Sequence, residues 1–170
     1  MDLEPLFSEQ EIDAAVHRIA KEISTDLAGE RPLIVCVLRG SFVFLADLVR
    51  ALDLPFEIDF VRARSYGAAM KSSGAVEITK DLETDVSGRH VIVVEDIADT
   101  GLTMNVVVER IKAGNPASVH RCALLVREGS EEPEYCGMTV GPGFVVGYGI
   151  DYAEDYRGLR DIRAIPGTTG

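Results

Sequence analysis

Hydrophobic residues recur along this chain at two spacings, one typical of amphipathic helices and one of buried strands. Near the N-terminus, Ser8 and Glu11 match a helix capping box, and apolar residues then recur at helical spacing until Gly29. The same pattern predicts two more helices, at residues 41–53 and 103–113. Apolar or alternating runs predict the strands, which fall at residues 32–38, 56–62, 75–82, 90–96, 118–126 and 144–149.

This order of strands and helices predicts an α/β fold, a mostly parallel twisted sheet with helices on both faces. In such sheets, ligands bind at the carboxyl ends of the strands. Three candidate segments therefore fall at one edge, namely Arg39–Gly40, Asp96–Thr103 and Arg127. The run FEIDFVR at 56–62 alternates apolar and polar residues, which predicts a strand with one exposed face.

The composition narrows the class of protein. A length of 170 residues suits a single domain, 1–170, and 46% hydrophobic with 26% charged residues is typical of soluble globular proteins. The first residues, MDLEPLFSEQE, lack the basic and apolar regions of a signal peptide, so we expect a cytoplasmic location. The cysteines form no CxxC pair and are expected to be reduced thiols; they are Cys36, Cys122 and Cys136.

The formal net charge is −11, which argues against nonspecific binding to nucleic acid, because such binding depends on Lys and Arg that neutralise phosphates. No apolar run approaches the roughly 20 residues that span a bilayer, so no membrane partner is expected. An anionic small molecule would have to be held by a local arrangement of backbone and side-chain donors.

Such an arrangement is predicted in the stretch VIVVEDIADTGLTM at 91–104. Gly101 lets the backbone approach a ligand closely, Thr100 and Thr103 offer hydroxyls, and the next helix begins there with free amide hydrogens. These features predict a phosphate site that uses no lysine. The alternative is that Asp99, Thr100 or Thr103 merely caps the helix.

Glu95 and Asp96 precede this turn, where negative charge is unfavourable. Two unit charges about 5 Å apart repel by roughly 3 kcal/mol at an effective dielectric constant of 20, and a phosphate adds to that repulsion. The arrangement is favourable if a divalent cation or sugar hydroxyls lie between the acids and the phosphate, and Mg²⁺ prefers a few carboxylates plus substrate oxygens. The motifs GxxxxGK[ST] and GxGxxG, which mark other phosphate sites, are absent from the sequence.

The stretch 91–104 resembles the phosphoribosyl-pyrophosphate signature of type I phosphoribosyltransferases. Three further stretches, 37–48, 58–67 and 144–159, resemble the hypoxanthine (hypoxanthine-guanine) phosphoribosyltransferases in order and spacing. The resemblance implies a purine salvage enzyme that joins a 6-oxopurine to phosphoribosyl pyrophosphate and releases pyrophosphate. It also implies Mg²⁺ as cofactor, a small hood built from the terminal segments, and a mobile lid around 65–75.

The resemblance assigns roles by position. Glu95 and Asp96 correspond to acids that address the ribose hydroxyls and a Mg²⁺, and Asp99 corresponds to the general base near purine N7. The turn that holds the 5′-phosphate corresponds to Asp99, Thr100, Gly101, Leu102 and Thr103. Pyrophosphate contacts correspond to the Arg39–Gly40 loop, in which the family has a cis peptide, to Ser65 and Tyr66 at the start of the lid, and to Arg157.

On the purine side, Phe144 corresponds to the residue that stacks on the base, Val145 to the backbone that reads its edge, and Asp151 to the ligand of a second Mg²⁺. Each has a simpler alternative from the sequence alone. Phe144 could be a core residue, and Arg157 could form a surface ion pair with Asp155 or Glu154. Arg39 could only support the helix that follows it.

The chain departs from the family at Arg127, where the family has a lysine that contacts the purine O6, and at Val126, where the family has an acid. We expect Arg127 to keep the preference for 6-oxopurines over adenine, because adenine would present a donor to a donor. Two alternative functions are a noncatalytic regulator that senses phosphoribosyl pyrophosphate and a transferase for another base. The resemblance further implies a homodimer or homotetramer, with 62–66 near a subunit contact.

Overall fold

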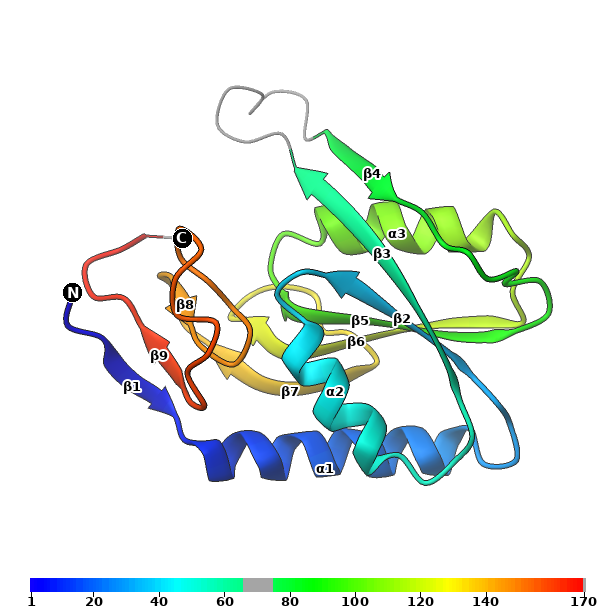
Figure 1. Cartoon of the computed structure of the whole chain (residues 1–170), viewed down its shortest axis with the longest axis horizontal. Coiled ribbons are helices and arrows are strands. Elements are labelled where there is room, and N and C mark those ends of the chain that lie inside the picture. The colour runs from blue at the N-terminus through cyan, green and yellow to red at the C-terminus, as the bar shows by residue number, and fades with distance from the viewer. Residues whose placement is uncertain (66–74, 170) are drawn as a thin grey trace.

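The computed structural model describes residues 1–65 and 75–169, except for the side chain of Ser65. Tyr66 and most of the predicted lid at 65–75 therefore lie outside the described residues. The main sheet has six strands in the order β4-β3-β2-β5-β6-β7 (Figure 1). Their bounds are Leu33–Leu38 for β2, Glu57–Ser65 for β3, Val76–Lys80 for β4, His90–Ala98 for β5, Ser118–Arg127 for β6 and Tyr135–Val140 for β7.

The pairings from β3 through β7 are parallel, and β4 pairs with β3 in the antiparallel direction. This arrangement confirms the predicted α/β fold with a mostly parallel sheet. The sheet is flanked by three helices, which are α1 (Glu9–Asp26), α2 (Phe42–Ala51) and α3 (Leu102–Lys112). Figure 1 shows α3 on one side of the sheet and α1 with α2 on the other.

Alternation along β2 explains why both faces of the sheet are covered. Ile34 and Cys36 belong to the core cluster that includes α1 and α2, whereas Leu33 and Val35 pack in a second cluster with α3. At the start of α1, the predicted capping box of Ser8 is present. Packing on both faces of the sheet thus fixes the position and direction of the strand ends.

A second, smaller sheet is built from the terminal parts of the chain. It contains β1 (Glu4–Phe7), β9 (Ile162–Ala164) and β8 (Val145–Val146), in the order β1-β9-β8. This is the predicted hood. The predicted strand at 144–149 is shorter than expected and belongs to this small sheet, because positive φ angles at Gly147, Tyr148 and Gly149 turn the chain immediately after β8.

The prediction of an exposed polar face on β3 is wrong at its centre. Asp59 is only 5% exposed, while Ile58 is 38% exposed. The Asp59 carboxylate accepts hydrogen bonds from the backbone amides of Phe60, Glu83 and Thr84 at 2.7–2.9 Å. Burial raises the pKa of Asp59, but these hydrogen bonds outweigh burial and hold it below its usual value. Asp59 therefore fixes the 83–84 loop to the sheet.

All three cysteines are free thiols, as predicted, and Cys36 and Cys122 are buried. Within the described ranges, no helix is both long and apolar enough to cross a membrane.

Candidate active site

The predicted site segments meet at the carboxyl end of the parallel strands. In the shared register, Cys36 of β2 lies beside Val94 of β5, and Val94 lies beside Cys122 of β6. The chain therefore leaves β2 at Arg39, β5 after Ala98 and β6 after Arg127 on the same edge of the sheet. The strand pairing between β2 and β5 stops at Cys36 and Val94, so these two strands part just before the edge.

Glycines let three segments touch at this edge. A Cβ added to Gly40 would lie 2.1 Å from Asp96 Oδ2, and a Cβ on Gly149 would lie 2.6 Å from the Gly40 carbonyl oxygen. Real side chains do not fit at such distances, so the Arg39–Gly40 loop is packed between β5 and the segment after β8. The cis peptide bond of this loop joins Leu38 to Arg39.

The turn after β5 leads into α3 through Gly101, which is the N-cap residue and has φ +79°. Gly101 has no side chain that could cap the helix; its carbonyl accepts the Asn105 amide at 2.8 Å, and the Leu102 amide reaches the Thr100 hydroxyl at 3.4 Å. A small cavity of about 60 Å³ adjoins Asp99, Thr100 and Gly101. The exposed start of α3 is thus arranged as an anion site, with amide hydrogens and the positive end of the helix dipole.

Glu95 and Asp96 lie in β5 as predicted, but the strand continues two residues beyond the predicted end, to Ala98. Burial, followed by the charges of Asp96 and Asp99, raises the pKa of Glu95 to about 8. Burial also raises the pKa of Asp96, although the Ile97 amide donates to its Oδ1 at 2.9 Å. Arg157 lowers the pKa of Asp96 and Asp151 raises it, which shows that these charges share one site. For Glu95, burial and the two neighbouring acids all disfavour the charged form, whereas Asp96 is partly compensated by Arg157.

The described residues contain no cluster of three or more His, Cys, Asp or Glu side chains that could hold a metal alone. Mg²⁺ is commonly bound through one or two carboxylates plus substrate oxygens, so such a cluster is not required. Glu95, Asp96 and Asp151 fit a site of this kind, because Asp96 lies close enough to each of the other two acids for their charges to interact. The missing oxygen ligands would come from the bound substrate.

The raised pKa of Glu95 predicts a pH dependence of stability. Between about pH 4.5 and pH 8 the folded state holds the Glu95 proton more tightly than the unfolded state, so the free energy of unfolding falls as pH rises through this window. We expect Glu95→Gln to remove this loss, which is on the order of 4 kcal/mol at pH 8 and below about 0.5 kcal/mol at pH 4.5. Thermal unfolding in metal-free buffer at both pH values measures it, with Glu109→Gln on the exposed face of α3 as control. Equal melting curves at pH 8 would contradict the expectation.

Three arginines at the edge are paired with acids of the same site. Arg39 contacts Glu154 at 3.0 Å, Arg157 contacts Asp151 at 3.1 Å, and Arg127 Nε lies 3.6 Å from Asp99 Oδ2. Arg157 also donates to the Gly149 carbonyl at 2.8 Å, and its side chain is only 20% exposed. The alternative for Arg157 is therefore confirmed in part: Arg157 does lie 3.7 Å from a carboxylate oxygen of Glu154, but its side chain is mostly buried and not at the surface.

Arg127 has a second set of contacts that the sequence did not predict. Its Nη1 donates to the carbonyls of Gly141 and Gly143, the latter at 2.8 Å. These carbonyls belong to the loop that leads into Phe144. Arg127 therefore connects the predicted purine segment to Asp99, and its guanidinium is 15% exposed.

Phe144 is 45% exposed, so the alternative that it is a core residue is wrong. Its ring lies 5.7 Å from the ring of Tyr152, measured between centroids, and its amide donates to the Thr168 hydroxyl at 3.0 Å. Val145 is buried in β8. Thr168 lies in the C-terminal tail, which had no predicted role. An exposed aromatic ring held by the hood offers a face on which a planar base could stack.

The remaining predicted residues that the structure describes also lie at this edge of the sheet. Leu102 and Thr103 form the first turn of α3, and Ser65 ends β3, where it pairs with Val76. Nothing further is described for Tyr66.

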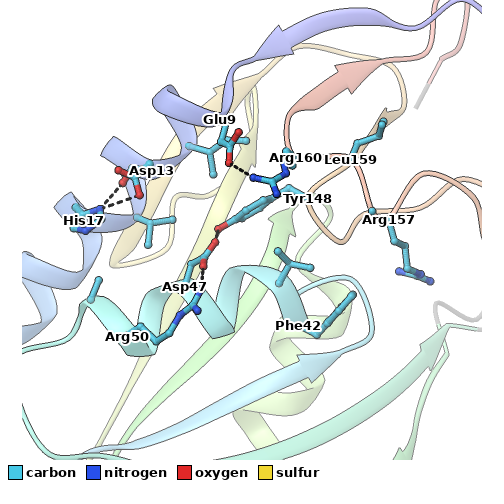
Figure 2. A pocket seen from close by; sticks show the side chains of 15 residues that line it. Glu9, Asp13, His17, Phe42, Asp47, Arg50, Tyr148, Arg157, Leu159 and Arg160 are labelled. Carbon is cyan, nitrogen blue, oxygen red and sulfur yellow. Dashed lines mark hydrogen bonds and ion pairs between the residues drawn. The ribbon is translucent and has the colours of Figure 1, made fainter.

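A cavity of about 720 Å³ lies behind the edge, between α1, α2 and the segment that ends at Arg160 (Figure 2). In Figure 2 the Arg157 guanidinium points away from the charged residues on its α1 side, which include Glu9 and Asp13. Tyr148 and Asp47 of α2 both line this cavity, and the Tyr148 hydroxyl donates a hydrogen bond to the Asp47 carboxylate. Burial and this hydrogen bond raise the pKa of Tyr148, so the phenol stays protonated and anchors the segment after β8 to α2.

The sequence of the chain also matches a known protein family. The phosphoribosyl transferase domain family matches residues 3–153 of the chain. The chain therefore belongs to the phosphoribosyltransferase family. Individual relatives indicate which members of this family it resembles.

A hypoxanthine phosphoribosyltransferase of Buchnera aphidicola is 41% identical over 160 residues, which cover 91% of this chain and 90% of the relative. The bifunctional protein TilS/HprT of Listeria monocytogenes is 42% identical, and the matched part of the chain spans only 24% of its length. A crystal structure of a hypoxanthine-guanine phosphoribosyltransferase from Bacillus anthracis matches with a TM-score of 0.90 and 38% identity, covering 95% of this chain and 98% of that one. Within its family, the chain is thus grouped with the hypoxanthine and hypoxanthine-guanine phosphoribosyltransferases.

Proposed function

We propose that this protein transfers the 5-phosphoribosyl group of phosphoribosyl pyrophosphate to N9 of hypoxanthine or guanine, which forms the nucleoside monophosphate and pyrophosphate. The observation that carries the proposal is the buried pair Glu95 and Asp96 beside the open start of α3, in a chain similar to enzymes named for this reaction. An acid pair next to an anion site is favourable for a ligand that carries phosphate, diol and cation together.

In this proposal, the turn Asp99–Thr103 binds the 5′-phosphate through backbone amides, and Glu95 with Asp96 orients the ribose hydroxyls. Glu95, Asp96 and Asp151 would hold Mg²⁺, which neutralises charge on the pyrophosphate when bound. Arg39 and Arg157 donate to the pyrophosphate as it leaves, because negative charge grows there. Asp99, whose side chain is half exposed, accepts the proton from purine N7 as N9 bonds to the ribose carbon.

The purine is placed by the hood. Phe144 offers its exposed ring for stacking, and the Val145 backbone meets the edge of the base.

We further infer that residues 1–170 act as one domain, that the protein works in the cytoplasm, and that it forms a homodimer or homotetramer. Light scattering would measure the oligomer; a similar Trypanosoma cruzi enzyme has been studied for the role of its C-terminal region in its oligomeric state.

A spectrophotometric assay with hypoxanthine, guanine, xanthine or adenine, together with phosphoribosyl pyrophosphate and Mg²⁺, tests the proposal. We expect turnover of hypoxanthine or guanine that stops when Mg²⁺ is chelated. Binding of phosphoribosyl pyrophosphate without turnover of any purine would instead support a regulator, a function that the relatives named above do not favour.

The contacts of Arg127 sharpen the expectation for purine choice. Its Nη1 is already bonded to the loop carbonyls, so the remaining guanidinium donors would face the purine O6. We expect Arg127→Ala to lower kcat/KM for hypoxanthine at least tenfold and by a larger factor than for adenine, because the lost contacts to the loop and Asp99 affect both purines while a lost donor to O6 affects only 6-oxopurines. Arg127→Lys should recover part of the loss. Unchanged discrimination between hypoxanthine and adenine would rule out this role.

A further inference from the structure

Glu154 contacts both arginines that the proposed function assigns to pyrophosphate. We propose that Glu154 is a positioning residue that occupies Arg39 and Arg157 in the ligand-free protein and yields them to the pyrophosphate group. This inference rests on the proposed function and adds a residue that the sequence analysis named only as a possible surface partner.

The contact between Glu154 and Arg39 has the form of a fork. Arg39 Nη2 donates to Glu154 Oε1 at 3.0 Å, and Arg39 Nη1 reaches Oε2 at 3.4 Å. Glu154 Oε1 also lies 3.7 Å from Arg157 Nη2. One carboxylate therefore links the loop after β2 with the segment after β8, although Arg39 and Glu154 are 115 residues apart in sequence.

The backbone holds Glu154 in this position. Glu154 has φ +70° and the preceding Ala153 has φ +52°, which non-glycine residues seldom adopt. The turn is closed by the Glu154 amide, which donates to Asp151 Oδ2 at 2.9 Å, and by paired backbone hydrogen bonds between Tyr152 and Asp155. A strained conformation that persists at a site indicates that its side chain is placed for a purpose.

The chemistry of the pair explains why pyrophosphate would displace it. A carboxylate and a phosphate present similar pairs of oxygens to the guanidinium fork, so Arg39 cannot donate fully to both. A phosphate with a bound cation carries more acceptor oxygens than a carboxylate does. Once pyrophosphate occupies Arg39, the charge of Glu154 lies close to it and repels it.

The exposure of the two ion pairs indicates which arginine exchanges its acid for pyrophosphate more readily. The Arg39 and Glu154 side chains are 52% and 64% exposed, so their ion pair is weak and readily broken. Arg157 and Asp151 are 20% and 29% exposed, and Arg157 is also tied to the Gly149 carbonyl. Arg157 is therefore the fixed contact and Arg39 the exchangeable one, so Glu154 controls mainly Arg39.

The charge of Glu154 thus opposes tight binding of pyrophosphate and favours its release. We expect Glu154→Gln to bind inorganic pyrophosphate about three- to tenfold more tightly, as the loss of one exposed ion pair and one like-charge contact predicts. In steady state, both the KM for phosphoribosyl pyrophosphate and kcat should fall, because slower product release limits turnover. A residue that only supported the fold would not lower both.

Isothermal titration of the full chain with inorganic pyrophosphate, with and without Mg²⁺, measures this affinity. The matched control is Glu9→Gln, since Glu9 contacts Arg160 at 3.1 Å with 57% exposure and touches neither Arg39 nor Arg157. A double-mutant cycle with Arg39→Ala isolates the pair: in that background, Glu154→Gln should gain less affinity than in the wild-type protein, because only its like-charge contact with pyrophosphate is left to remove. Thermal unfolding of each variant verifies that it is folded.

Unchanged or weaker pyrophosphate binding by folded Glu154→Gln would overturn the inference, and so would an equal gain in the Arg39→Ala background. These outcomes are distinct from failure of the proposed function. If wild-type protein neither binds pyrophosphate nor transfers a phosphoribosyl group, the proposed function itself is wrong, whatever the variants do.

Discussion

Asp99→Asn is expected to lower kcat for hypoxanthine by about 10²–10⁴-fold, the usual contribution of a positioned general base. Asparagine keeps the shape of the side chain but cannot take up the purine proton. The KM for phosphoribosyl pyrophosphate should change much less, because the proposed function assigns the phosphate to the backbone amides of the turn and not to the Asp99 side chain. Steady-state kinetics with each substrate varied separately measure both values.

A second effect of Asp99→Asn is electrostatic. The Asp99 charge contributes to the raised pKa of Glu95, so its removal should move that pKa downward. The control is Asp85→Asn, in an exposed turn where Asp85 accepts the Ser87 amide at 2.9 Å. A kcat within threefold of wild type would show that Asp99 is not the base.

The position of the site could be predicted because it depends on strand order alone. The apolar runs in β2, β5 and β6 are each followed by a polar segment, and parallel strands bring those segments to one edge. The start of α3 was predictable for the same local reason, since Gly101 and the residues around it are adjacent in sequence. These parts of the fold depend on local patterns of apolar and turn residues.

Other elements could not be predicted, because their signals are weak or distant. β7 was missed: its sequence, YCGMTV, contains Gly137, which reads as a breaker. In the structure a Cβ at Gly137 would lie 2.3 Å from the Leu124 carbonyl oxygen, so glycine permits the close pairing of β7 with β6. Asp59 was misplaced because its partners, the amides at 83 and 84, lie more than twenty residues away.

The contacts among charged residues were the least predictable part of the site. Glu154 reaches Arg39 across 115 residues, and Thr168 supports Phe144 from the tail. Nothing in local sequence distinguishes these residues from ordinary surface ones. Together with Asp99 and Asp151, Glu154 neutralises the site arginines of a chain whose net charge is −11. Substrate anions must therefore compete with the protein's own acids, which weakens their binding.

Gly40→Ala is expected to lower kcat/KM for phosphoribosyl pyrophosphate at least 100-fold. The added methyl group would lie 2.1 Å from Asp96 Oδ2 and 2.9 Å from its Cγ, so either the Arg39–Gly40 loop or the Asp96 carboxylate must move. A displacement of about 1 Å at a positioning residue can by itself lower a rate about 100-fold. Because Gly149 packs on the Gly40 carbonyl, the shift would also reach the segment that carries Asp151.

Overpacking should also lower the free energy of unfolding of Gly40→Ala by about 1–3 kcal/mol, which chemical denaturation measures. Gly158→Ala is the matched control, since an added Cβ there meets no atom within 4 Å and Gly158 has no positive φ. It should change stability by less than about 0.5 kcal/mol and leave kinetics near wild type. If Gly40→Ala behaved like Gly158→Ala, the contact between the loop and Asp96 would not be needed for binding. The close packing of Gly40 on Asp96 would then be incidental, and pyrophosphate would depend on the arginines alone.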